Sequence, residues 1–193
     1  MCVSDNDLIE CERVNLDYFN RAPVRVEAAE VIAASPKRIF DVFLDADSWS
    51  RWAWPITGVD WTSPMPLEVG STRTVWMRGP MVGYEEFIAW EPGRRMAFRF
   101  NQTIKGGPSA FAEDYLVTDL RDGRSLVEWT MAMTLTGVSA RFARFTGPAM
   151  GPANRAMLRR FRTYVESNPM LADEASNSST NASRNSATRP RAT

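Results

Sequence analysis

The chain has 193 residues, of which 44% are hydrophobic, and its 23 basic and 23 acidic side chains give a formal net charge of zero. This length suits one domain, and the balanced charge provides no overall field that would draw the chain to nucleic acid or to an anionic membrane. Because the sequence contains no histidine, it excludes serine–histidine and cysteine–histidine catalytic systems and histidine-ligated metal sites. Any catalysis would use carboxylate, Tyr, Arg or Lys groups or bound water, and we expect no cofactor.

Neither end of the chain has the pattern of a folded domain. Residues 1–22 are acidic with little periodicity, and we expect them to form a mobile or loosely docked extension. They contain both cysteines, Cys2 and Cys11, which we interpret as reduced thiols of a cytoplasmic protein. Residues 169–193 are polar and almost free of large apolar side chains, so we expect a disordered tail. The predicted domain comprises residues 23–168.

The domain begins with a strand pattern and continues with two short helices. Apolar and polar side chains alternate over residues 24–33, which is typical of a half-buried strand. Ser35 and Pro36 suit the N-cap and first position of a helix, and the apolar residues that follow extend this helix to about Leu44. A second short helix is predicted around Trp49–Trp52.

Six more strands are predicted after these helices, because apolar residues return to a period of two. Pro-Gly and Asp-Gly turns separate several of them, and such short connections indicate an antiparallel meander. The predicted strands are Ile56–Thr62, Ser71–Arg78, Val82–Glu91, Arg94–Gln102, Phe111–Leu120 and Leu126–Thr136.

A long amphipathic helix closes the domain. From Ala149 onward, apolar residues recur every fourth position, which predicts one buried stripe, and Pro169 cannot continue the helix. Residues Ser139–Phe145 predict a separate short turn that stops before Gly147. A strongly bent antiparallel sheet can wrap around such a helix and bury its stripe.

This order of elements resembles the helix-grip fold of START-like lipid-binding domains, birch-pollen-allergen-type proteins and polyketide cyclases. The matching segments are SPKRIFDVFLDADSWSRW, VGSTRTV, FIAWEPGRRMAFRF and DGRSLVEWTM, together with the closing Arg-rich helix. The resemblance covers about residues 24–168. It implies an α+β fold in which a curved antiparallel sheet of about seven strands wraps around the C-terminal helix. It also implies a cavity between sheet and helix, where members bind lipids, sterols, polyketides or hormones and some catalyse cyclisation or dehydration.

Strand alternation predicts which side chains face such a cavity. The apolar candidates are Trp61, Val75, Met77, Tyr84, Ile88, Phe98, Trp129, Met131 and Met133 on the sheet, with Met157 and Phe161 on the long helix. The charged and polar candidates on the same face are Arg73, Glu86, Glu113 and Tyr115. An inward cluster of charges would need internal partners, and it would orient a polar ligand group or serve acid–base chemistry. A one-residue shift at a β-bulge would instead turn these charges toward solvent.

Four tryptophans, Trp49, Trp52, Trp54 and Trp61, surround the second short helix. They either line the mouth of a pocket or fasten the short helices to the edge of the sheet, because Trp is above all a large apolar surface.

Three functions remain open from the sequence. We expect storage, transport or sensing of a small hydrophobic ligand such as a lipid or polyketide. The first alternative is a polyketide cyclase or dehydratase that uses carboxylate, Tyr or Arg groups of the cavity. The second is a regulatory or toxin–antitoxin protein with a collapsed cavity. We interpret the Arg-rich last helix as a solvated face and expect neither a nucleic-acid partner nor a transmembrane segment; the sequence leaves a homodimer open.

Overall fold

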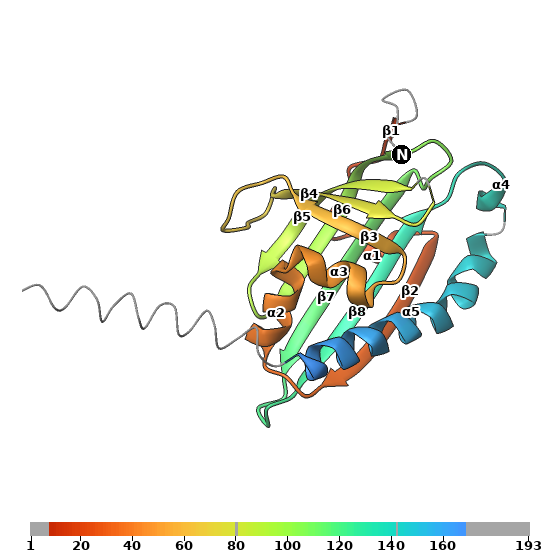
Figure 1. Cartoon of the computed structure of the whole chain (residues 1–193). Helices are drawn as coiled ribbons and strands as arrows, with labels where there is room; N and C mark the ends of the chain where they lie inside the picture. The colour runs from red at the N-terminus through yellow and green to blue at the C-terminus, as the bar shows by residue number, and fades with distance from the viewer. Residues whose placement is uncertain (1–7, 80, 142, 169–193) are drawn as a thin grey trace, which may run out of the picture.

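The structure, a computed structural model, describes residues 8–79, 81–141 and 143–168. One strongly curved antiparallel sheet carries the strands, and a long helix crosses its concave side (Figure 1). The helices are α1 (Tyr18–Arg21), α2 (Pro36–Leu44), α3 (Ala46–Trp52), α4 (Gly137–Ala140) and α5 (Ala143–Ser167). The strands are β1 (Leu8–Glu10), β2 (Val24–Ile32), β3 (Ile56–Trp61), β4 (Thr72–Met77), β5 (Val82–Glu91), β6 (Arg95–Ile104), β7 (Ala110–Asp119) and β8 (Ser125–Thr134).

The sheet has the order β2-β8-β7-β6-β5-β4-β3, so most neighbours in space are also neighbours in sequence. Every pairing is antiparallel, as the short turns predicted. Strand β2 forms one edge of the sheet and pairs with β8 from Val24↔Met133 to Ile32↔Ser125. The predicted α+β arrangement, with two short helices after the first strand of the domain, is confirmed.

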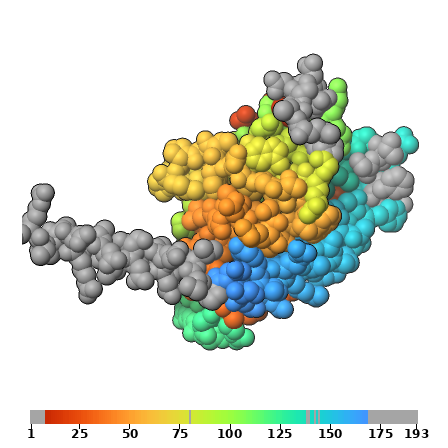
Figure 2. Space-filling model, viewed as in Figure 1, coloured from red at the N-terminus to blue at the C-terminus, as the bar shows by residue number. Residues whose placement is uncertain are grey.

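The two short helices are positioned by their caps and by aromatic packing. The Ser35 hydroxyl accepts a hydrogen bond from the Arg38 amide at 3.3 Å, and Pro36 occupies the first turn. Phe43 of α2 stacks on Phe161 of α5 with 5.1 Å between ring centroids, and Trp52 of α3 meets the same ring at 4.8 Å. Figure 2 shows α2 and α3 (orange) lying directly against α5 (blue). Together the three helices cover the concave side of the sheet.

Helix α5 begins earlier than the sequence predicted. It runs without a break from Ala143 through Pro148 and Pro152, so the predicted stop before Gly147 is wrong, and the separate short helix before it is α4 (Gly137–Ala140). Tertiary packing explains the difference: a Cβ at Gly147 would lie 3.2 Å from the Arg25 carbonyl oxygen of β2. The glycine therefore lets the first turns of the helix approach the strand closely, and this contact compensates for weak local helix propensity.

Residues 8–22 pack against the convex side of the sheet, whereas the sequence predicted a mobile or loosely docked extension. Strand β1 pairs with β6 beyond the last β6–β7 pair, and Val14, Tyr18 and Phe19 are buried. Five alanines of the sheet lie beneath them: Ala89, Ala97, Ala110, Ala112 and Ala132. These small side chains leave room for a segment that covers the sheet. The alternation of apolar residues in the sequence does not predict such a covering segment. Residues 1–7 and the predicted tail 169–193 lie outside the described residues.

None of the helices in the described part of the chain has the length and apolar character needed to span a bilayer.

Candidate functional site

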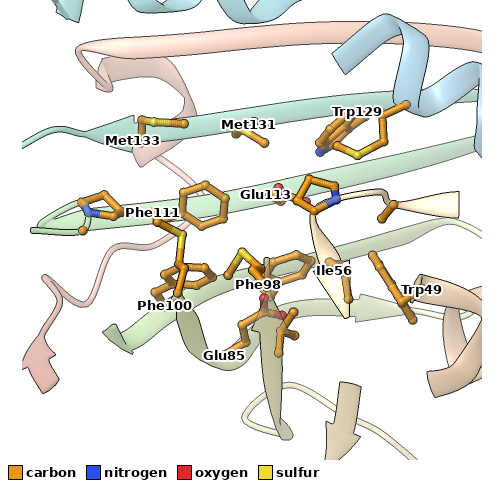
Figure 3. Close-up of a pocket in the computed structure, with 18 of the residues that line it drawn as sticks. Trp49, Ile56, Glu85, Phe98, Phe100, Phe111, Glu113, Trp129, Met131 and Met133 are labelled. Carbon is orange, nitrogen blue, oxygen red and sulfur yellow. The ribbon is translucent and has the colours of Figure 1, made fainter. Parts of the chain in front are cut away.

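A cavity of about 340 Å³ lies between the concave face of the sheet and helices α3 and α5 (Figure 3). Its volume is within the range of small-molecule sites. Six methionines contribute to the wall: Met77, Met81, Met131, Met133, Met150 and Met157. Seven aromatic side chains complete most of it: Trp49, Trp52, Phe98, Phe100, Phe111, Tyr115 and Trp129. The lining is thus largely apolar, with adaptable thioethers beside rigid rings.

Three charged side chains contribute to this apolar wall: Arg73, Glu85 and Glu113. Arg73 and Glu85 are cross-strand partners on β4 and β5, and the Arg73 Nε donates to Glu85 Oε2 at 2.6 Å. The side chain of Arg73 is 0% exposed and that of Glu85 is 4% exposed. Burial raises the pKa of Glu85, and the neighbouring guanidinium opposes this rise. Removing either partner would leave a buried charge without compensation.

The Arg73 guanidinium is surrounded by aromatic rings. Its Cζ lies 4.1 Å from the ring centroid of Trp49 and 4.6 Å from that of Phe98, with Trp61 and Phe87 both at 5.4 Å. These cation–π contacts stabilise the charge. They supply no hydrogen-bond acceptor in the plane of the guanidinium, and neither Nη1 nor Nη2 has a hydrogen-bond partner among the described residues.

Glu113 of β7 forms a second polar pair with Tyr115, whose hydroxyl donates to Glu113 Oε2 at 2.8 Å. Burial raises the pKa of Glu113 to about 8, and the charge of Glu85 adds to the rise, while Tyr115, Arg73 and Trp129 oppose it. Burial also raises the pKa of Tyr115 well above its ordinary value, with a further rise from Glu113. At neutral pH Glu113 is therefore mostly protonated, and it holds this proton at the cavity wall beside the neutral Tyr115.

Strand β5 presents a different set of side chains from the one predicted. Glu86 lies on the convex side, where it accepts hydrogen bonds from Arg99 Nη2 at 3.0 Å and Asn101 Nδ2 at 2.8 Å. Ile88 packs with the convex-side cluster, and Tyr84 is half-buried and lies outside the cavity wall. The predicted inward positions of these three residues are wrong.

The cause is a break in the β5–β6 register. The pairing shifts between Phe87 and Ala89, so strict alternation back from Trp90 gives the wrong face for the earlier residues. Gly83, Glu85 and Phe87 carry the alternation of the concave side, and Phe87 is fully buried. Two adjacent large apolar residues, Phe87 and Ile88, were the signal in the sequence that marked this irregularity.

Most of the other predicted residues are at the cavity. Ten of them line its wall: Arg73, Val75, Met77, Phe98, Glu113, Tyr115, Trp129, Met131, Met133 and Met157. Trp61 and Phe161 lie outside the wall and pack in the adjoining apolar core. The Trp61 indole donates to the Leu44 carbonyl at 3.0 Å, so this tryptophan fastens α2 to the sheet. Trp49 and Trp52 do line the cavity, whereas Trp54 is 51% exposed.

Sequence reasoning missed one charged residue and one edge of the cavity. The charged residue is Glu85, which the bulge places opposite Arg73. The edge comprises Met81, Met150 and the β6–β7 turn at Gly106–Pro108, which come from two hairpin turns and the start of α5. No periodic pattern identifies residues in turns as part of a wall, so this edge follows from the three-dimensional curvature alone.

Comparison with known proteins gives a family for this arrangement. Residues 23–166 match the sequence profile described as polyketide cyclase/dehydrase and lipid transport. The chain belongs to this family. A relative within curated proteins is the uncharacterized protein Rv2574 of Mycobacterium tuberculosis, which is 45% identical over 166 residues, covering 86% of this chain and 98% of the relative. Membership in the cyclase/dehydrase and lipid transport family agrees with the resemblance drawn from the sequence.

Solved structures share the fold at low sequence identity. The aromatase/cyclase Zhui of Streptomyces sp. R1128 superposes with a TM-score of 0.62 at 14% identity, covering 77% of this chain and 96% of that one. The hypothetical protein jhp0584 of Helicobacter pylori gives 0.63 at 13% identity, covering 86% and 99%. At these identities the likeness shows the helix-grip fold of the polyketide cyclase/dehydrase and lipid transport family and leaves the activity open.

Proposed function

We propose that this protein binds a small hydrophobic ligand in the cavity between the sheet and α5, in storage, transport or sensing. The observation that supports this proposal most directly is the cavity of about 340 Å³ with its methionine and aromatic lining. Burial of apolar ligand surface supplies most of the binding free energy in such a site, and a few polar groups set the orientation. The family, whose description includes lipid transport, supports this proposal. We place the activity in the cytoplasm on the basis of the sequence.

Native mass spectrometry of the purified protein tests this proposal. We expect an adduct of small-molecule mass, or uptake of the neutral apolar probe 1-aminoanthracene by a ligand-free sample. The substitution Met133→Trp, which fills the cavity, should abolish both signals. The matched control Leu116→Trp adds a tryptophan at a position on β7 that is 37% exposed and outside the cavity wall, and it should leave both signals unchanged. Absence of adduct and of probe binding in the unsubstituted protein would refute the proposal.

A cyclase or dehydratase activity is the second candidate, and the Glu113–Tyr115 pair favours it. A carboxylic acid with a pKa of about 8 can deliver a proton at neutral pH, and Arg73 can stabilise negative charge that develops on a carbonyl oxygen. The family description and the Zhui aromatase/cyclase support this candidate.

The enzymatic candidate requires that Glu113→Gln lose turnover of a poly-β-ketone substrate while ligand binding is retained. Glu86→Gln, a carboxylate of the convex side, is the matched control and should keep full turnover. The rate should fall above about pH 8, because Glu113 then loses its proton. Equal turnover by Glu113→Gln and the unsubstituted protein would exclude this role. A collapsed interior, the premise of the regulatory or toxin–antitoxin alternative, is inconsistent with the cavity.

A further inference from the structure

The buried polar atoms that lack hydrogen-bond partners share one chemical character. In the described ranges they are all N–H donors: Arg38 Nε and Nη1, Trp52 Nε1, Arg73 Nη1 and Nη2, and Trp129 Nε1. Arg38 lies on α2 near the end of α5, and the other three residues belong to the cavity wall. Unpaired buried donors cost free energy that a ligand acceptor can recover. Arg73 is the wall residue with two such donors, so the wall lacks hydrogen-bond acceptors most clearly at its guanidinium.

We infer that the ligand is an apolar molecule with a single carboxylate end, and that this carboxylate binds between Arg73 and Glu113. The inference rests on the proposed function and adds the chemical class of the ligand. The Arg73 Nε is already bonded to Glu85, which leaves the Nη edge of the guanidinium for a second acceptor. A planar guanidinium with two free nitrogens matches the two oxygens of a carboxylate.

Other polar ends fit this place less well. An ester or ketone accepts hydrogen bonds without charge, so its bonds to a guanidinium are weaker than those of a carboxylate. A hydroxyl brings a donor of its own to a group of atoms that already lacks acceptors. An amine places a second positive charge beside Arg73, which the buried ion pair with Glu85 does not offset.

The state of Glu113 decides whether a second carboxylate is tolerated. The groups that act on it are Arg73 on β4, Glu85 on β5, Tyr115 on β7 and the indole of Trp129 on β8. Because Tyr115 donates to Oε2, the proton of the neutral acid lies on Oε1. Oε1 is therefore the atom of Glu113 that can donate a hydrogen bond to a ligand. A protonated Glu113 hydrogen-bonds to the ligand carboxylate, whereas an ionised Glu113 repels it.

Access to Arg73 requires that cavity side chains move, because its side chain is 0% exposed. The two nearest rings, Trp49 and Phe98, belong to the cavity wall, so their movement would open the guanidinium to the cavity. A volume of about 340 Å³ has room for about eleven groups the size of a water molecule at roughly 30 Å³ each. A saturated acid with ten carbons has about twelve non-hydrogen groups, close to this size, and serves as a probe.

The competing explanation assigns Arg73 and Glu85 to the fold alone. Four aromatic rings and one carboxylate then satisfy the guanidinium, and ligands of equal size bind with equal affinity whatever their polar end. The two explanations thus differ in one measurable quantity, the affinity difference between a carboxylate and a neutral isomer.

Titration calorimetry with four probes measures that difference: decanoate, its isomer methyl nonanoate, 1-decanol and decylamine. At pH 6.5 we expect decanoate to bind at least about tenfold more tightly than methyl nonanoate. A hydrogen bond to a charged group contributes more binding free energy than a neutral one, and the usual difference corresponds to about tenfold in affinity. The alcohol and the amine should bind more weakly still. Between pH 6.5 and 9.5 the affinity for decanoate should fall about tenfold while that for methyl nonanoate stays constant.

Two variants assign the effect to the residues named. Glu113→Gln should keep the preference for decanoate and lose its pH dependence. The double variant Arg73→Met/Glu85→Met removes both charges at similar volume and avoids a lone buried carboxylate. It should bind decanoate and methyl nonanoate equally.

Equal affinities for decanoate and methyl nonanoate in the unsubstituted protein would overturn the inference, and so would failure of all four probes to bind. The proposed function is judged separately, by the adduct and by 1-aminoanthracene, neither of which depends on a carboxylate. A protein that binds 1-aminoanthracene but shows no carboxylate preference retains the proposed function and refutes only the ligand class.

Discussion

The charged residues on the two sides of the sheet differ in how completely they are hydrogen-bonded. On the convex side, Arg95 binds Asp114 through two hydrogen bonds of 3.0 and 2.7 Å, and Glu86 accepts from Arg99 and Asn101. On the concave side, Arg73 has one bonded nitrogen and two that find no partner in the described part of the chain. The same strands thus carry a satisfied polar network outside and an incomplete one inside. Incomplete hydrogen bonding of buried groups is costly for the fold alone and is typical of functional sites.

The apolar surfaces of the two sides differ as well. The convex alanines pack directly beneath Val14, Tyr18 and Phe19, so at these alanine positions a larger side chain would meet the covering segment. The concave side carries methionines and large rings around an empty volume. Substitutions of similar size should therefore have different consequences on the two sides, and the following experiments compare them.

The largest effect is expected for the Arg73–Glu85 pair. Arg73→Met leaves Glu85 buried without its partner, which should reduce the free energy of unfolding by about 3–5 kcal/mol. The double variant Arg73→Met/Glu85→Met should recover most of this loss, because hydrophobic residues of similar volume replace both charges. Urea denaturation measures both values. A double variant as unstable as the single one would show that the pair itself stabilises the fold.

Glu113 should make stability depend on pH. Its pKa is raised from 4.5 to about 8 in the folded protein, so between these values the folded state binds more protons than the unfolded state. Stability should therefore fall as pH rises through this window, by up to about 1.4 kcal/mol per pH unit. Glu113→Gln removes this pH dependence. The free energy of unfolding of the variant should therefore rise steadily relative to that of the unsubstituted protein from pH 5 to 8. A difference independent of pH would contradict the raised pKa.

Enlarging a convex alanine should be destabilising. Ala112 is fully buried beneath the N-terminal segment, and Ala112→Val should cost about 1–3 kcal/mol because the added methyl groups have no space. On the concave side, Met133→Leu preserves the volume of a side chain at the cavity and should change stability by less than about 1.5 kcal/mol. Thermal denaturation of the two variants compares them directly. Equal losses would indicate that the cavity is no more adaptable than the convex side.

The smallest effect is expected for Glu86→Gln. The carboxylate is partly exposed, and the glutamine can still accept one of its two hydrogen bonds, so the loss should stay below about 1 kcal/mol. Hydrogen bonds from Asn101 and Arg99 lower the pKa of Glu86 against the opposing effect of its burial. The stabilising contribution of this carboxylate is therefore present above about pH 4.5 and is lost as the pH falls and Glu86 becomes protonated. Ligand affinity should be unchanged, and a change would indicate that the two sides of the sheet are coupled.

The order of elements could be predicted from the sequence because each carries a strong local signal. Ser35-Pro36 marks the start of α2, and the uninterrupted alternation from Val127 to Met133 marks β8 and its inward face. The inward positions of Arg73, Glu113 and Tyr115 followed from the same alternation. These predictions depend on interactions between near neighbours in the sequence.

The errors arose where distant parts of the chain decide the outcome. The register shift belongs to the pairing of β5 with β6, and it exchanged Glu86 for Glu85 at the cavity. The packing of residues 8–22 depends on alanines from four strands, which no local pattern brings together. The early start of α5 depends on the close approach of Gly147 to β2.

The attachment of the N-terminal segment has a consequence for the rate at which a ligand enters and leaves. The Cys11 amide donates to the Asn101 carbonyl at 2.8 Å, and the Glu12 amide donates to the Ser109 carbonyl at 2.7 Å. These bonds hold the base of the β6–β7 hairpin, whose turn at Gly106–Pro108 forms one edge of the cavity. Loosening residues 8–12 would remove these bonds to the hairpin, so we expect a variant weakened there to exchange a cavity ligand faster.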